Sequence, residues 1–292
     1  MRGMRVAVIG ATGNVGCALA PALLERGAKL LTIARRAERF RFLGHGTAQW
    51  AIDLDGDGLL LKRALANVDC AINVAHPKYT RAIIAALPGP AARLITLGST
   101  RKFTRYPDQK AAEVLDAEAA HAGVNGVILH PTMIYGGRDN NISRILRIVR
   151  RAPFVPMPQA GTALMQPIHR DDVVLSLIAA IGHDVNGPPL VIAGAKALSY
   201  AALVRACGEA VGRDMKIISM PAPGMRVLAR ASQWLPGLPS VTGEEVQRLL
   251  EDKAFDIAPM QARLGVRPCT FEEGLARMRM AGEIAGQNAF QF

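Results

Sequence analysis

Aromatic residues are scarce in this sequence of 292 residues, at 5% of the chain, and there are only four cysteines. Proteins that bind single-stranded nucleic acid alternate basic side chains with aromatic ones that stack on the bases. This chain shows no such alternation, so we exclude nucleic acid as a partner. Cys17, Cys70, Cys207 and Cys269 are scattered without the spacing of a metal or redox site. We therefore expect reduced thiols, no metal centre and a cytoplasmic protein.

Long hydrophobic runs are also absent. No apolar stretch approaches the roughly 18 residues that a transmembrane helix needs, and Gly10, Gly13 and Gly16 interrupt any signal-peptide core near the N-terminus. Half of the residues are nevertheless hydrophobic and 20% are charged, which is typical of an ordered globular protein. We expect one large domain with a smaller appendage, and no membrane-spanning segment.

Acidic residues are in deficit, at 24 against 35 lysines and arginines, so the formal net charge is +11. Two interpretations stay open. The basic side chains are spread over a solvated surface, or they meet an anionic partner such as a phosphorylated cofactor, a nucleotide-linked substrate or, in peripheral contact, an acidic membrane surface. Arg144, Arg147 and Arg151 lie near one face of a helical pattern and allow the same two interpretations. The oligomeric state stays open as well.

The most informative stretch is VAVIGATGNVG at residues 6–16. A β-branched apolar run ends there in a glycine turn, and an apolar helical pattern follows at once. Gly10 allows the tight exit from the strand, Gly13 lets a pyrophosphate approach the backbone, and Gly16 lets the helix pack closely. The open N–H groups at the helix start then bind the anion. This pattern predicts a dinucleotide site.

Strand and helix patterns alternate through the first two thirds of the chain. Such alternation predicts a doubly wound parallel α/β sheet, a Rossmann fold of about seven strands. The expected strands are 4–9, 28–34, 48–52, 69–74, 92–98, 124–129 and 188–193. The expected helices are 14–26, 57–67, 77–87, 107–122, 140–151 and 171–182.

The pattern changes to helices and loops after about residue 195. We expect a dinucleotide-binding domain over 1–195 and a small, mainly helical substrate or lid domain over 196–292, with 152–168 crossing between them. Thr242 with Glu245, and Thr270 with Glu273, have capping-box spacing, which predicts helix starts. Four prolines divide the segment 218–240 into short pieces: Pro221, Pro223, Pro236 and Pro239.

The end of the second strand bears on the choice of cofactor. A fold that prefers NAD usually has an acid there to hold the ribose hydroxyls, whereas this chain has Ala34 followed by Arg35 and Arg36. A guanidinium can pair with a 2′-phosphate, so we favour NADP, with NAD as the alternative. Asp53 is placed to accept from the adenine amino group, with Leu54 against the ring; a turn-forming or helix-capping Asp53 explains the sequence nearly as well.

Small residues end the fourth strand at Asn73, Val74 and Ala75, where a nicotinamide ribose would pass, although they also suit ordinary packing. Pro131, Thr132 and Met133 follow a later strand and are expected to line the nicotinamide. The full set of expected cofactor-binding residues is Gly10, Thr12, Gly13, Asn14, Val15, Gly16, Arg35, Arg36, Asp53, Leu54, Asn73, Val74, Ala75, Lys110, Pro131, Thr132 and Met133.

Candidate catalytic residues follow the fifth strand. Tyr106 and Lys110 are four residues apart, so on a helix they share one face. A nearby ammonium lowers the pKa of a phenol, which can then exchange a proton with a substrate oxygen that Ser99 or Thr100 holds. Alternatively, Pro107 begins the helix and Tyr106 is only a cap-region residue.

An acidic pair at Asp171 and Asp172 precedes a further apolar helix. Aspartate at such a place is most often an N-cap. His169 just before it is more readily explained as a packed or hydrogen-bonded histidine than as a base.

Taken together, these residues resemble the extended and atypical short-chain dehydrogenase/reductase superfamily, in its branch of nucleoside-diphosphate-sugar epimerases and dehydratases. The resemblance rests on GATGNVG at 10–16, ILHPTMIYG at 128–136, HRDDV at 169–173 and the tail at 251–275. It implies a seven-stranded parallel sheet, a bound nicotinamide cofactor and a C-terminal substrate domain.

The resemblance also implies roles for single residues: Tyr106 as the acid/base, Lys110 as its partner, and Ser99 or Thr100 as the orienting hydroxyl. The chain departs from the pattern in two places. Tyr106 lies seven residues after Ser99, where relatives have some two dozen, and His130 stands where relatives often carry arginine. The chain further resembles atypical members that bind the cofactor without turnover, among them NmrA-like sensors and the accessory subunit of respiratory complex I. Two functions are thus open: hydride transfer between the nicotinamide and a carbonyl or secondary alcohol, and cofactor binding as a sensor or scaffold.

Overall fold

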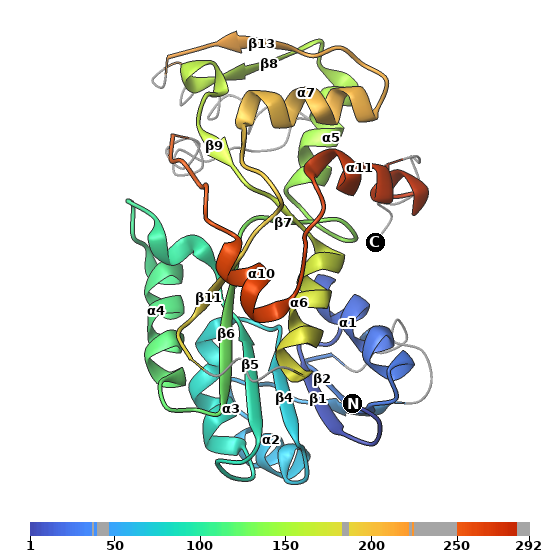
Figure 1. Cartoon of the computed structure of the whole chain (residues 1–292), viewed down its shortest axis with the longest axis vertical. Coiled ribbons are helices and arrows are strands. Elements are labelled where there is room, and N and C mark those ends of the chain that lie inside the picture. The colour runs from blue at the N-terminus through green and yellow to red at the C-terminus, as the bar shows by residue number, and fades with distance from the viewer. Residues whose placement is uncertain (37, 40–46, 183–186, 222–223, 225–249, 285–292) are drawn as a thin grey trace.

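The computed structural model describes residues 1–36, 38–39, 47–182, 187–221, 224 and 250–284. A seven-stranded sheet lies in the lower half of Figure 1. The strand order is β11-β6-β5-β4-β1-β2-β3, and all neighbouring pairs are parallel. All seven expected strands are confirmed. Their bounds are β1 Arg5–Ile9, β2 Lys29–Ala34, β3 Ala48–Ala51, β4 Cys70–Asn73, β5 Arg93–Leu97, β6 Gly126–Pro131 and β11 Leu190–Ile192.

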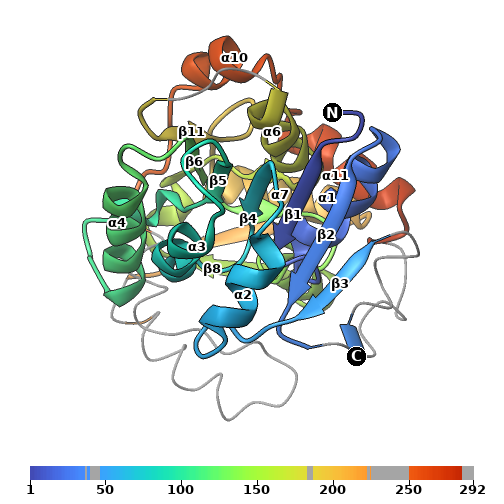
Figure 2. The ribbon, with the colours of Figure 1, turned by 90° about the horizontal axis from the view of Figure 1, so that it is seen from below.

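Helices cover both faces of this sheet, as the view from below shows (Figure 2). Apolar side chains of α1 (Asn14–Glu25), α6 (Arg170–Gly182) and α10 (Ala258–Leu264) pack on one face. On the other face lie α2 (Gly58–Leu65), the short η2 (Pro77–Tyr79) with α3 (Thr80–Ala86), and α4 (Gln109–His121). The doubly wound α/β architecture is confirmed.

The strand order reverses between β1 and β4, because the chain leaves β3 and returns beside β1. In open parallel sheets, ligands bind beyond the carboxyl ends of the strands at such a reversal. The fold therefore places the glycine turn after β1 at the position where a dinucleotide is expected.

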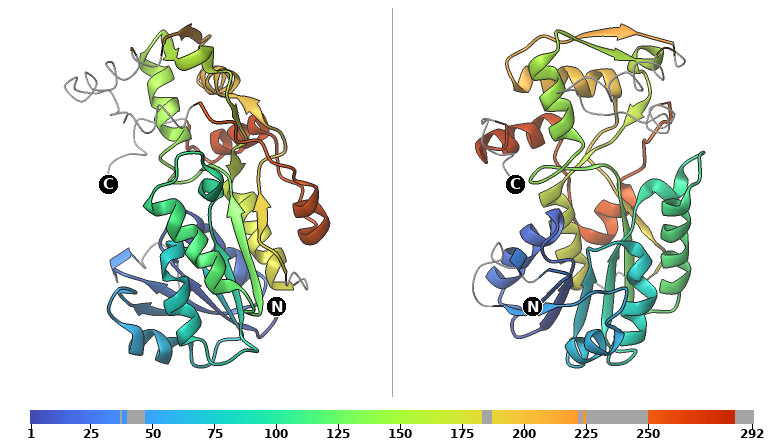
Figure 3. Two further views of the ribbon diagram at one scale, coloured as in Figure 1. Left: turned by 90° about the vertical axis from the view of Figure 1, so that its left-hand side faces the viewer. Right: turned by 180° about the vertical axis from the view of Figure 1, so that it is seen from behind.

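A second apolar core lies beyond the carboxyl edge of the sheet (Figure 3). The helices that form it are α5 (Ile142–Arg151), α7 (Tyr200–Ala210) and α11 (Phe271–Met280). Three short strand pairs accompany them: β7 (Ile134–Tyr135) with β10 (Ile168–His169), β9 (Leu164–Met165) with β12 (Leu198–Ser199), and β8 (Phe154–Met157) with β13 (Lys216–Ser219). This smaller part thus includes α5, β8 and β9, which precede residue 195. The helix α10 follows residue 195 but packs on the seven-stranded sheet.

Helix starts test the capping predictions. Thr270 caps α11 in a capping box with Glu273, as predicted. Thr242 and Glu245 lie outside the described residues, as do Pro223, Pro236 and Pro239.

The predicted N-cap role of Asp172 is wrong. The helix α6 begins at Arg170, and the buried Asp172 in its first turn accepts hydrogen bonds from Cys269 N (2.9 Å) and Arg277 (3.3 Å). It therefore joins α6 to the C-terminal part of the chain. His169 is packed, as expected: it is buried against Tyr135, and its Nδ1 accepts from Asp171 N at 3.3 Å.

The remaining surface and thiol expectations concern α5 and the cysteines. Arg147 and Arg151 are exposed on α5, whereas Ile145 and Val149 are buried.

All four cysteines have reduced, unlinked thiols, and burial raises the pKa of Cys70, Cys207 and Cys269 to about 12. Over the described ranges, no helix combines the length and the apolar composition needed to cross a bilayer.

Candidate functional site

The glycine turn between β1 and α1 is shaped by close backbone contacts. Gly10 has a φ of +87°, and a Cβ there would lie 2.7 Å from Ala75 N. A Cβ on Gly16 would lie 2.4 Å from Gly10 O, so Gly16 lets the helix start fold back onto its own turn. Gly13 is the N-cap of α1, and it brings no side chain between the helix start and the space beyond it. The first-turn N–H groups of α1 are left to bind an anion.

A cavity of about 300 Å³ opens beside this turn. Asp53 and Leu54, the residues predicted to contact an adenine, line it. Tyr79 also lines it, and sequence reasoning missed this residue because no motif marks it. The complete lining is Ile9, Gly10, Thr12, Gly13, Ile33, Ala34, Arg35, Ile52, Asp53, Leu54, Val74, Ala75 and Tyr79.

An ion-pair cluster fixes Tyr79 at the edge of this cavity. The Tyr79 hydroxyl donates to Asp55 at 2.7 Å, and Lys78 Nζ donates to the other carboxylate oxygen at 2.9 Å. Lys78 holds the pKa of Asp55 below its usual range, with Tyr79 adding to the effect. The loop after β3 and the segment η2 are thereby joined across the cavity mouth. The arrangement suits a flat aromatic ring inserted between apolar walls and Tyr79.

A smaller cavity of about 180 Å³ continues outward from the turn. It is lined by Thr12, Arg35, Arg36 and Arg39. Arg35 and Arg36 were predicted here, whereas Arg39 was missed, although its position in an arginine-rich stretch was a signal. Three guanidinium groups around one small cavity form a site for a phosphate-sized anion.

On the other side of the turn lies a cleft of about 730 Å³, which shares Val74 and Ala75 with the first cavity. Seven of the predicted residues line this cleft: Val74, Ala75, Ser99, Thr100, Pro131, Thr132 and Met133. The remaining lining residues are His76, Pro77, Leu97, Gly98, Arg101, Thr104, Ile134, Asn141, Met165, Gln166, Glu251 and Lys253.

The two predicted hydroxyls at the cleft differ in their hydrogen bonds. Thr100 Oγ1 donates to Pro131 O at 3.1 Å, so its proton is committed to β6. Ser99 Oγ accepts from Arg101 N at 3.1 Å at the start of η3 (Thr100–Phe103), which leaves the Ser99 hydroxyl proton for donation. Ser99 is the better placed of the two to donate to a substrate oxygen.

Several predicted cofactor residues do not line any of these cavities. Asn14 Nδ2 donates to Gly136 O at 3.0 Å, and its Oδ1 accepts from Arg138 N at 2.7 Å, so it joins α1 to the loop after β7. Val15 is buried in the core. Asn73 is fully buried and accepts from Ala75 N at 3.1 Å, which shapes the end of β4.

Tyr106 and Lys110 are not brought together at the cleft, and neither lines it. The Tyr106 side chain is large and exposed, at 47%, and Lys110 is exposed as well. The predicted helix start at residue 107 is wrong: Asp108 is the N-cap, with its side chain accepting from Ala111 N at 2.9 Å, and α4 begins at Gln109. Tyr106 therefore precedes the helix, and the helical spacing that would have placed it beside Lys110 does not apply.

A buried carboxylate holds the loop that carries Tyr106. Glu251, only 5% exposed, accepts from Thr104 Oγ1 at 2.9 Å and from Arg105 N at 2.6 Å. Lys253 Nζ lies 4.0 Å from the same carboxylate. Sequence reasoning missed Glu251, because its partners Thr104 and Arg105 are about 150 positions away. Lys253 was missed as well, because no local pattern marks it.

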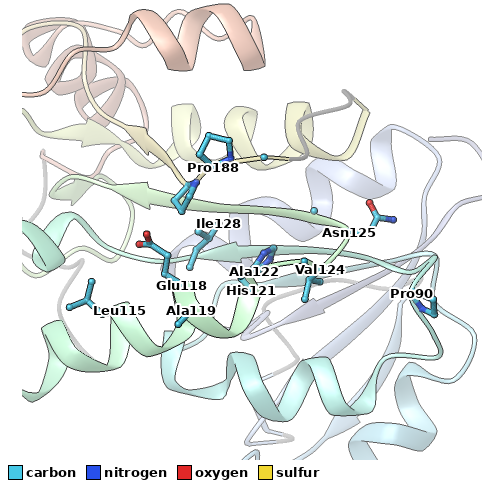
Figure 4. A pocket seen from close by; sticks show the side chains of 14 residues that line it. Pro90, Leu115, Glu118, Ala119, His121, Ala122, Val124, Asn125, Ile128 and Pro188 are labelled. Carbon is cyan, nitrogen blue, oxygen red and sulfur yellow. The ribbon is translucent and has the colours of Figure 1, made fainter.

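Another cavity, of about 840 Å³, lies elsewhere, beside the amino ends of β6 and β11 (Figure 4). It is an open groove between α4 and these strands, with Leu115 and Glu118 at one end and Pro90 and Asn125 at the other. None of the predicted site residues lines it. Since dinucleotides bind at the carboxyl edge of such sheets, we place the functional site at the cleft and not in this groove.

Comparison with known proteins confirms the fold. The sequence matches no protein-family model and no curated relative. In structure, the chain is similar to UDP-glucuronic acid 4-epimerase from Bacillus cereus in complex with UDP-glucuronic acid and NAD, with 16% identity, 94% of this chain and 97% of that chain covered, and a TM-score of 0.69. It is also similar to UDP-glucose 4-epimerase with UDP-glucose from Thermotoga maritima, with 13% identity, coverage of 95% and 99%, and a TM-score of 0.71.

A third similar structure is an NAD-dependent NDP-hexosamine 5,6-dehydratase involved in tunicamycin biosynthesis, with 15% identity, coverage of 94% and 95%, and a TM-score of 0.66. The chain thus shares the fold of these epimerases and this dehydratase over nearly its whole length.

Proposed function

We propose that this protein is an extended short-chain dehydrogenase/reductase that binds a nicotinamide dinucleotide and acts on a carbonyl or secondary alcohol. The observation that carries the proposal is the continuity of two cavities at the carboxyl edge. The 300 Å³ cavity and the 730 Å³ cleft meet at Val74 and Ala75, on either side of the glycine turn. The smaller cavity suits an adenosine, and the glycine turn suits a pyrophosphate. The larger cleft suits a nicotinamide with a substrate beside it.

The residues present fit such a cofactor. Gly10 and Gly13 line the cavity, so no side chain blocks the backbone where a pyrophosphate must approach. A Cβ on Gly10 would lie 2.7 Å from Ala75 N. When bound, the nicotinamide ring supplies or accepts a hydride. The chain itself would bind the ring along Pro131 and Met133, and the Ser99 hydroxyl would donate to the substrate oxygen. Structurally similar epimerases bind UDP-sugars, and a nucleotide-linked substrate is our proposal for this cleft as well.

We further propose that the cofactor is NADP. Arg35, Arg36 and Arg39 surround a phosphate-sized cavity that adjoins the adenosine half through Thr12 and Arg35, and β2 ends in Ala34 without an acid. NAD, which several of the similar structures bind, is the alternative.

Calorimetric titration with NADPH and NADH tests this assignment. A hydrogen bond between charged groups contributes about 1.5 to 3 kcal/mol, so Arg35→Ala with Arg36→Ala should weaken NADPH binding by roughly a hundredfold or more. NADH binding should change by less than about threefold. Arg205→Ala, an exposed arginine on α7, is the matched control and should change neither. Equal or tighter binding of NADH by the unaltered protein would refute the NADP assignment.

The exposed position of Tyr106 favours a second candidate function, namely cofactor binding without turnover. NADPH oxidation against a panel of carbonyl compounds separates the two functions. If Tyr106 and Lys110 work as an acid/base pair, Tyr106→Phe and Lys110→Met should each lower turnover by roughly two to four orders of magnitude. A protein that binds NADPH tightly and oxidises it with no carbonyl would support the sensor function.

A catalytically active Lys110→Met protein with unchanged cofactor affinity would show that Tyr106 and Lys110 do not act as an acid/base pair. In that case Ser99→Ala, which removes the hydroxyl at the cleft, should still abolish most of the turnover. Melting temperatures measured on the same preparations show whether each variant is folded.

A further inference from the structure

Two successive residues of β6 accept hydrogen bonds from the loop that carries Ser99 and Thr100. His130 Nδ1 accepts a hydrogen bond from Ser99 N at 3.1 Å, and Pro131 O accepts from Thr100 Oγ1 at 3.1 Å. His130 is fully buried, and its ring packs against the end of β5, since a Cβ on Gly98 would lie 2.5 Å from Nδ1. The side chain of His130 therefore sits directly beneath the backbone of Ser99.

This hydrogen bond determines the tautomer of the histidine. A backbone N–H can only donate, so Nδ1 must carry no proton, and the proton of the neutral ring is on Nε2. Nε2 lies 3.1 Å from Glu118 Oε2; the two atoms are not aligned for a hydrogen bond, but the charge of the carboxylate attracts the Nε2 proton. Glu118 also contacts Lys102 Nζ, which belongs to the same loop as Ser99.

The charged groups around His130 come from two elements, Lys102 from η3 and Glu118 from α4. Burial, followed by the charge of Lys102, lowers the pKa of His130 to about 4, so the ring is neutral near neutral pH. Glu118 extends from α4 towards Ile128 of β6 at one end of the open groove (Figure 4). The ring is thus hydrogen-bonded to Ser99 N on the cleft side and lies against the carboxylate of Glu118 on the side of α4.

We propose that His130 is a positioning residue, which sets the place of the Ser99 hydroxyl in the cleft through the Ser99 backbone N–H, while Glu118 holds the required tautomer. This inference rests on the proposed function only where Ser99 is said to meet the substrate. Ser99 is the N-cap of η3, so fixing its backbone nitrogen also fixes the direction from which its Oγ reaches the cleft. A displacement of about 1 Å at such a group can cost a hundredfold in rate.

Two substitutions of His130, each of which replaces only one of the two ring nitrogens with a similar polar group, test this proposal. Asparagine places an amide oxygen near the position of Nδ1, so His130→Asn keeps an acceptor for Ser99 N. Glutamine reaches the position of Nε2, so His130→Gln keeps a donor for Glu118 and loses the acceptor for Ser99 N. Glu118→Leu, at a partly exposed residue, removes the carboxylate beside Nε2 without changing the histidine.

The primary measurement is the backbone amide resonance of Ser99 and its rate of hydrogen exchange by NMR. His130→Gln and Glu118→Leu should shift the resonance and speed exchange by tenfold or more, whereas His130→Asn should stay close to the unaltered protein. With a carbonyl substrate, kcat should fall by roughly 10- to 100-fold in His130→Gln, with the Kd for NADPH unchanged and with recovery in His130→Asn.

The outcomes separate this inference from the proposed function. If the Ser99 amide responds as expected but no carbonyl is reduced, His130 positions Ser99 and the proposed enzymatic function fails. If His130→Gln and Glu118→Leu are folded and leave the Ser99 amide and kcat unchanged, the inference is wrong. Equal loss in His130→Asn and His130→Gln would also overturn it, because that result indicates simple loss of packing.

Discussion

Replacing Asp172 tests how the C-terminal part is attached to the sheet. Asp172 lies in the first turn of α6 and is 1% exposed. Its Oδ2 accepts from Cys269 N at 2.9 Å, and its Oδ1 accepts from Arg277 at 3.3 Å. Cys269 directly precedes Thr270, the N-cap of α11, so a single carboxylate links α6 to the start and to the last turn of that helix.

The expected cost of Asp172→Ala follows from these two bonds. Removal of the carboxylate leaves the buried Cys269 N–H without its acceptor, which costs about 1 to 3 kcal/mol. The Arg277 side chain is 42% exposed, so solvent screens its ion pair, and the loss of this pair adds at most about 1 kcal/mol. We therefore expect the free energy of unfolding to fall by about 1 to 4 kcal/mol, and the melting temperature by roughly 2 to 12 °C.

Urea unfolding followed by circular dichroism measures this change. Asp171→Ala is a matched control, because the neighbouring side chain is 49% exposed and its ion pair with Arg170 lies at the surface; we expect a change of about 0.5 kcal/mol or less. Arg277→Gln should cost no more than about 1 kcal/mol. If Asp172→Ala proved no more destabilising than Asp171→Ala, the attachment described here would be refuted.

Two further predictions concern pH and the glycine turn. Burial lowers the pKa of His121, His130 and His169 below the value of about 6.5 in an unfolded chain. Between pH 7 and pH 5 the unfolded state therefore binds more protons than the folded state, and the free energy of unfolding falls on acidification. His130 alone accounts for about 2 kcal/mol of this fall. Urea unfolding at both pH values measures this, and greater stability at pH 5 would contradict it. Gly16→Ala places a Cβ 2.4 Å from Gly10 O and should weaken NADPH binding by tenfold or more in calorimetry, whereas Gly58→Ala, where the Cβ meets nothing within 4 Å, should leave it unchanged.

The parallel sheet was predictable because its strands are marked locally. Each is a short apolar run that ends in a turn, and buried parallel strands need no contribution from distant residues to be recognised. The glycine turn was predictable for the same reason, since Gly10, Gly13 and Gly16 belong to one continuous motif. The start of α4 shows where local signals compete: Pro107 suits a first helical turn, but the side chain of Asp108 caps the helix instead.

The contacts that organise the site join residues far apart in the sequence. Asp172 has its partners in Cys269 and Arg277, and Glu251 has its partners in Thr104 and Arg105. In the sequence, an aspartate before an apolar helix is indistinguishable from an N-cap. Only the fold brings the C-terminal tail to α6 and to the loop after β5, so these roles could not be read from any local pattern.

The same long-range contact determines what a catalytic Tyr106 would require. If its hydroxyl enters the cleft by a movement of this loop, Glu251 must release Thr104 and Arg105. Hydrogen bonds to a charged group contribute about 1.5 to 3 kcal/mol each, so losing both costs about 3 to 6 kcal/mol. The protein without substrate would then hold Tyr106 in the cleft in roughly one molecule in a hundred to one in ten thousand. An enzyme that depends on Tyr106 must obtain this energy from substrate binding, whereas Ser99 already lies at the cleft.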